Sequence, residues 1–75
     1  MKRIYWKVAG EKITDHEKRI CEMVLKDKSY EDIAKEWNRS LHTIRTEVKT
    51  LFDRLRIHNK GALINMLHKH GIEPC

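Results

Sequence analysis

The sequence predicts an all-α domain of four helices with a short N-terminal extension. Apolar residues recur at three- and four-residue steps along most of the chain, as they do on the buried face of an α-helix. Ser, Thr or Asn residues, which favour helix N-caps, stand at the start of these stretches. A chain of 75 residues forms one domain and cannot form two. We expect residues 1–12 to form the extension, 13–72 the helical domain and 73–75 a C-terminal tail.

The extension has the pattern of a short extended segment. Apolar Ile4, Trp6 and Val8 alternate with their neighbours, which is the period of a β-strand. Aromatic side chains so close to a terminus are unusual in a disordered tail. We therefore expect this segment to dock on the domain or on a partner chain, and Gly10 to end it.

The first two helices begin with capping patterns. Thr14 and Glu17 match a capping box, in which the side chain of each residue accepts a hydrogen bond from the backbone N–H of the other. Asp27 tolerates the left-handed conformation that ends many helices. The second helix begins at Ser29, with Asp32 three residues later. The residues expected to face the core are Ile20, Cys21, Met23, Val24 and Leu25 in the first helix and Ile33, Ala34 and Trp37 in the second.

The third helix has two contrasting faces. It begins with Ser40 as its N-cap and runs to about Leu55. Its apolar stripe comprises Ile44, Val48, Leu51 and Leu55, and the hydrogen-bond donors between them are His42, Thr43, Arg45, Thr46, Lys49 and Thr50. Arg and Lys bind guanine edges in the major groove of DNA, and Thr contacts thymine methyls. This pattern predicts a DNA-reading helix.

The second and third helices are close together in the sequence. Only Asn38, Arg39 and Ser40 separate them, and two helices joined by a three-residue turn are typical of a helix-turn-helix. Asn38 suits this turn because Asn enters left-handed conformations easily.

The fourth helix is predicted to start after Asn59 and to end at Gly71, with Pro74 preventing any continuation. Its inward-facing residues are expected to be Leu63, Ile64 and Leu67. Met66 extends this apolar surface, and two locations stay open for it, the core and a dimer interface.

The net charge of +5 is unevenly distributed. Residues 39–60 contain six basic and two acidic side chains, a balance of +4. Residues 11–38 contain six basic and eight acidic ones, a balance of −2. Segregated positive charge is typical of proteins that bind polyanions, although a solvated basic face has the same pattern.

The composition excludes several classes of protein. A charged fraction of 36% and the lack of a long apolar run exclude a membrane span, and no apolar block follows Lys2 and Arg3 as in a signal peptide. Cys21 and Cys75 are expected to stay reduced, with Cys21 in the core. We therefore predict a cytoplasmic protein without contact with membranes.

We predict no enzyme activity, no cofactor and no metal site. The histidines, His16, His42, His58, His68 and His70, do not have the spacing of zinc ligands. The chain lacks a glycine-rich phosphate loop, and its predicted helices would not bring together a Ser, a His and an acid. A domain this small also offers little room for a substrate pocket.

Over about residues 13–72 the sequence resembles the LuxR/GerE-type helix-turn-helix family. The matching positions are Ile13, Thr14, Glu17, Ile20, 29–37, Ser40, 43–46, Val48, Leu51, Leu55, Ile57, Asn59, Lys60, 62–64, His70 and Gly71. The resemblance implies a four-helix domain that binds double-stranded DNA as a homodimer, commonly through the fourth helix.

The resemblance also implies site residues. The base-reading positions would be Arg45, Thr46 and Lys49. Contacts to the DNA backbone would come from Ser40, His42, Thr43, Thr50, His58 and Lys60, and dimer contacts from Ala62, Met66 and His70.

Four residues depart from the family pattern. Asp15 replaces a common Pro, and an acidic residue suits the first turn of a helix. Arg39 replaces an apolar residue that plugs the turn, so either Leu41 packs there or Arg39 contacts phosphate. Glu47 replaces a frequent His, and its carboxylate would accept from a cytosine amine or orient Arg45 or Lys49. Arg56 replaces a usual Gly, so this turn either differs or carries about 1 kcal/mol of strain.

Two classes of function stay open. The first is a sequence-specific, DNA-binding transcription regulator that acts as a homodimer, with residues 41–55 as its recognition helix. The alternative is a protein-interaction module of the same fold that binds another regulator or RNA polymerase. The basic face favours the first. A fragment of a larger receptor is a third possibility, but the start Met and the extension indicate a complete small protein, controlled by its abundance or by a partner.

Overall fold

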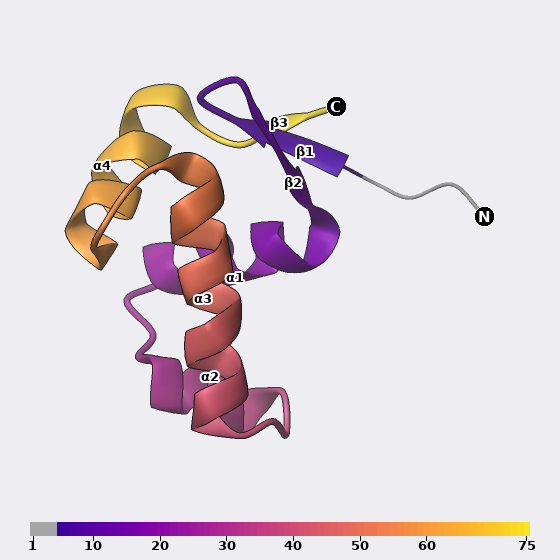
Figure 1. The fold of residues 1–75 in the computed structure, drawn as a ribbon, viewed down its shortest axis with the longest axis vertical. Helices are drawn as coiled ribbons and strands as arrows, with labels where there is room; N and C mark the ends of the chain where they lie inside the picture. The colour runs from indigo at the N-terminus through magenta and orange to yellow at the C-terminus, as the bar shows by residue number, and fades with distance from the viewer. Residues whose placement is uncertain (1–4) are drawn as a thin grey trace.

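The computed structural model describes residues 5–75, which form four helices and a small sheet (Figure 1). The helices are α1 (Asp15–Leu25), α2 (Tyr30–Glu36), α3 (Leu41–Leu55) and α4 (Lys60–His70). The strands are β1 (Tyr5–Val8), β2 (Glu11–Thr14) and β3 (Glu73–Pro74). The four predicted helices are therefore confirmed, and the sheet adds a feature that the sequence did not predict. Ile4, part of the predicted alternation, lies outside the described residues.

The sheet is antiparallel, with the strand order β2-β1-β3. A two-residue turn joins β1 to β2, and both of its residues have positive φ, 51° at Ala9 and 83° at Gly10. Positive φ at both positions is the geometry of the type I′ turns that suit two-residue hairpins. Val8 and Ile13 are fully buried, so the hairpin docks on the helical domain, as predicted for the extension.

The predicted N-caps are confirmed at all four helices. Thr14 and Ser29 each form a full capping box, with Glu17 and Asp32 respectively. Hydrogen bonds from the backbone and hydroxyl of Ser29 lower the pKa of Asp32 below its ordinary value. The side chains of Ser40 and Asn59 accept from the backbone N–H three residues later. Local sequence thus sets where each helix begins.

The helix ends follow from left-handed residues. Asp27 and Asn38 have φ of 60° and 53°, as their short polar side chains allow. Arg56 caps α3 with φ of 58°, so this turn keeps the left-handed conformation without its usual Gly. Such a conformation costs a non-glycine residue about 1 kcal/mol.

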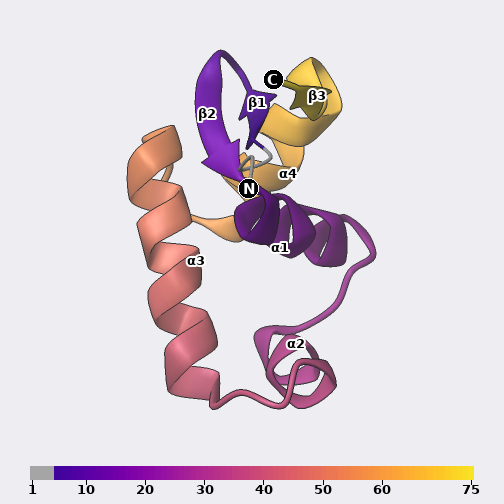
Figure 2. The same cartoon turned by 90° about the vertical axis from the view of Figure 1, so that its right-hand side faces the viewer.

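The core lies between the helices and the sheet. Its buried hydrophobic residues are Val8, Ile13, Ile20, Cys21, Met23, Val24, Ile33, Ala34, Ile44, Val48, Leu51, Leu55, Leu63 and Leu67. Trp37, Ile64 and Met66 are half-buried and pack against this core. The expectation for Leu25 was wrong: its side chain is 42% exposed, because one residue step beyond Val24 turns it away from the buried stripe of α1. In Figure 2, α3 forms one edge of the molecule, and α1, α2 and α4 all lie on the same side of α3. One face of α3 is thus left without a covering element.

None of the helices in residues 5–75 is both long enough and apolar enough to cross a lipid bilayer.

Candidate nucleic-acid interface

The uncovered face of α3 carries the residues predicted to read bases. Arg45, Thr46 and Lys49 are all exposed, whereas Ile44 and Val48 are buried on the opposite face. Because α-helical residues three and four positions apart share a face, the three polar side chains form a continuous surface. This surface can donate hydrogen bonds from two cationic side chains to one nucleic-acid groove.

The threonines on this face use their hydroxyl protons within the helix. Thr46 Oγ1 donates to the carbonyl oxygen of His42, and Thr50 Oγ1 donates to that of Thr46, both at 3.0 Å. These bonds to the preceding turn fix the rotamer of each side chain. The methyl group of Thr46 thus remains for apolar contact, which is how Thr recognises thymine.

The first turn of α3 brings together two of the predicted backbone contacts. Ser40 Oγ accepts from the backbone N–H of Thr43 at 3.1 Å and lies 2.8 Å from Thr43 Oγ1. His42 is exposed beside them. Helix N-termini favour anions because their backbone N–H groups point outward. This end of α3 therefore suits a phosphate.

The other predicted backbone contacts lie apart from the first turn of α3. His58 is exposed in the connection to α4. Lys60 Nζ donates to the carbonyl oxygen of Lys28 at 3.2 Å and lies 5.6 Å from the ring centroid of Tyr30. Its ammonium group thus sits at the connection between α1 and α2, and it would have to leave this carbonyl to reach DNA.

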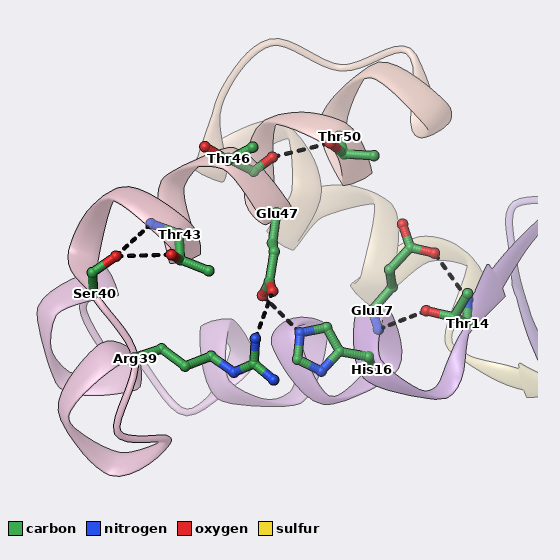
Figure 3. A network of polar contacts seen from close by, with 9 residues as sticks. All are labelled: Thr14, His16, Glu17, Arg39, Ser40, Thr43, Thr46, Glu47 and Thr50. Atoms are coloured by element: carbon green, nitrogen blue, oxygen red, sulfur yellow. Dashed lines mark hydrogen bonds and ion pairs between the residues drawn. The ribbon is translucent and has the colours of Figure 1, made fainter.

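Glu47 forms a network that the sequence did not predict (Figure 3). One of its carboxylate oxygens lies 2.6 Å from His16 Nε2, and the other accepts from Arg39 Nη1 at 3.4 Å. The His16 ring also lies against Trp37, with 5.1 Å between ring centroids. The network therefore joins α1, the turn of the helix-turn-helix and α3. Glu47 orients Arg39 and not the two cationic residues proposed from the sequence.

A second ion pair holds α3 against α1. Arg54 Nη1 lies 3.1 Å from the carboxylate of Glu17, which is the one buried charged residue among residues 5–75. The same carboxylate accepts from the backbone N–H of Thr14 at 2.9 Å. Glu17 thus caps α1 and anchors α3, which fixes the orientation of the exposed face.

The residues predicted for dimer contacts are four positions apart and share one face of α4. This face lies next to the buried face that carries Leu63 and Leu67. Ala62 and Met66 are half-buried, and His70 is exposed. Met66 is half-buried and packs against the core, which is one of the two locations that the sequence left open for it.

Two helices joined by a tight turn, with the second helix exposing a basic face, define a helix-turn-helix DNA-binding domain. Comparison with protein families identifies it further. The GerE model, described as bacterial regulatory proteins of the luxR family, matches residues 11–67. The chain therefore belongs to the LuxR family. Its domain binds DNA and regulates transcription, and the family is not enzymatic. Comparisons with curated proteins and with solved structures found no match.

Proposed function

We propose that this chain is a sequence-specific transcription regulator that binds DNA as a homodimer, with α3 in the major groove. One observation carries the proposal: Arg45, Thr46 and Lys49 share an exposed face of a helix whose other face is buried. An α-helix fits the major groove, where these side-chain types distinguish base pairs. We place this activity in the cytoplasm, where a bacterial regulator meets its DNA.

The backbone contacts are assigned to residues around this face. Ser40, His42, Thr43 and Thr50 lie on α3 or at its start, and His58 and Lys60 follow it in the chain. The local balance of six basic against two acidic residues over 39–60 supports this assignment, because phosphate contacts dominate the affinity for DNA.

Selection of sequences from a random duplex library with the purified chain tests the proposal. Enrichment of a motif with two-fold symmetry would support a dimer that reads sequence, with half-sites about 10 bp apart, since one helical turn separates two such recognition helices. Weak, salt-sensitive binding without enrichment would contradict it. That result would favour the interaction module that binds another regulator or RNA polymerase.

The dimer contact on α4 has its own test. Ala62 is the third residue of α4, where an acid favours the helix N-terminus, so Ala62→Glu should leave the fold intact. If Ala62, Met66 and His70 face a second copy, the variant should sediment as a monomer and bind the symmetric motif at least tenfold more weakly. His68→Glu adds the same charge on another flank of α4 and should stay dimeric. A monomeric wild type on DNA would contradict the homodimer.

A further inference from the structure

The network around Glu47 borders a surface hollow next to the turn of the helix-turn-helix. The hollow measures about 250 Å³ and is lined by His16, Arg19, Trp37 and Arg39. These side chains come from α1, the end of α2 and the turn before α3. Liquid water occupies about 30 Å³ per molecule, so the hollow has room for a tetrahedral anion.

We propose that this hollow binds a phosphate of the DNA backbone at the rim of the major groove, beyond the contacts made by α3 itself. The inference rests on the proposed function. It adds Arg19 to the DNA-contacting surface and adopts for Arg39 the phosphate contact that the sequence left open. Glu47 becomes a positioning residue that does not touch DNA.

The donor chemistry supports an anion. Each guanidinium carries five N–H groups, and each of these arginines uses one nitrogen in an ion pair. Arg39 uses Nη1 toward Glu47 at 3.4 Å, and Arg19 uses Nε toward Asp15 at 3.3 Å. The side chains of Arg19 and Arg39 are 67% and 49% exposed, so their other N–H groups reach solvent. The two carboxylates therefore hold the guanidinium groups and leave donors for a phosphate oxygen.

The position of the hollow also supports a DNA phosphate. Arg39 directly precedes Ser40, the N-cap of α3, so the hollow adjoins the helix terminus assigned to phosphate binding. On the other side of the His16–Glu47 pair, a second hollow is lined by Thr46 and Thr50 of α3. A helix about 10–12 Å wide fills a groove about 12 Å wide, so phosphates line both of its flanks. A cation on the flank of α3 thus faces the backbone.

The test compares Arg19→Ala, Arg39→Ala and Lys26→Ala for affinity to the selected operator over a range of salt concentrations. Each arginine variant should bind roughly threefold to tenfold more weakly, and its slope of log affinity against log salt should flatten by about one unit. Lys26 is exposed at the other end of α1 and serves as the charge-matched control.

Modified DNA then identifies the phosphate. Neutral methylphosphonates are placed one at a time along the operator. At one position flanking each half-site, the methylphosphonate should weaken binding by wild type. The same modification should not weaken binding by Arg39→Ala, which has already lost that contact. Arg19 lies outside the Glu47 network. If circular dichroism shows that Arg39→Ala is misfolded, Arg19→Ala therefore still tests whether the hollow binds a phosphate.

The inference is overturned if wild type binds the operator but the folded arginine variants match Lys26→Ala in affinity and salt slope. In that case the proposed function stands, because operator binding is unaffected. If wild type selects no operator at all, the proposed function itself fails, and the two failures are thus distinguishable.

Discussion

At the scale of single residues, the two thiols have opposite surroundings. Cys21 is fully buried on α1, and Cys75 is exposed near the C-terminus. Burial, together with the negative charge of Glu17, raises the pKa of Cys21 from 9.0 to about 12. A raised pKa means that the folded state keeps a proton that the unfolded chain loses as pH rises.

This difference predicts that Cys21 lowers stability in alkaline solution. The contribution of the Cys21 thiol to the unfolding free energy is intact below pH 9.0, and it is lost as the pH rises toward about 12. Between pH 8 and pH 10, wild type should lose on the order of 1 kcal/mol of unfolding free energy relative to Cys21→Ala. Urea denaturation of both proteins at each pH measures this difference, with Cys75→Ala as the control. A difference that stays constant with pH would refute the assignment.

Glu47 shows why some residue roles could not be predicted from the sequence. The sequence indicated that its carboxylate stands next to the reading face, but not which cation it meets. Its partner His16 is 31 positions away, on another helix. Such a pair depends on how α1 and α3 cross, which no local pattern in either helix specifies. The exposure of Arg45 and Lys49 was predictable because it follows from the helical period alone.

At the scale of elements, the N-cap of α3 separates folding from DNA binding. Ser40→Ala removes the acceptor for the backbone N–H of Thr43 and should cost about 1 kcal/mol of unfolding free energy. Ser40→Asp keeps a capping acceptor, so its stability should match wild type within about 0.5 kcal/mol. Thermal denaturation measures both.

The same pair of variants tests the assigned phosphate contact. Because the carboxylate of Ser40→Asp would repel a phosphate, this variant should bind DNA more weakly than Ser40→Ala despite its greater stability. Equal affinities would show that Ser40 serves α3 only as a cap.

The hairpin is the element that the sequence predicted least completely. Its alternation indicated a docked extended segment, which is confirmed, but its pairing with residues 11–14 was missed. Hairpin turns of this kind usually carry Asn-Gly or Asp-Gly, and here the first position is Ala9. The pairing of β3 with β1 joins distant parts of the chain, and β3 ends in Pro74. The residues of the turn and the alternation of apolar residues were therefore not enough to predict the sheet.

The hairpin contributes to stability through its buried strand residues. Val8 is fully buried, so Val8→Ala should cost about 2 kcal/mol through lost burial and the cavity left behind. Lys7→Ala changes the exposed neighbour on the same strand and should cost less than about 0.5 kcal/mol. Chemical denaturation measures both. Equal effects would mean that β1 does not contribute to the core.

At the scale of the whole molecule, the elements that hold α3 in place lie apart from the face of α3 proposed to contact DNA. The sheet pairs the N-terminal segment with the C-terminal one, and it lies at the end of the molecule near α4 (Figure 1). Buried Glu17 and the Glu47 network fasten α3 to α1. These contacts leave one face of α3 uncovered and hold its orientation. We therefore expect this face of α3 to read the base sequence.

The claim that α3 reads bases is tested by comparing the affinities of Arg45→Ala and wild type for the selected operator and for random duplex. The claim predicts a loss of roughly 1–3 kcal/mol on the operator, a relaxed preference at one base position per half-site and little change on random duplex. Lys26→Ala, at the exposed C-terminal end of α1, should change neither affinity. An equal loss on operator and random duplex would contradict the claim and assign Arg45 to the phosphate backbone.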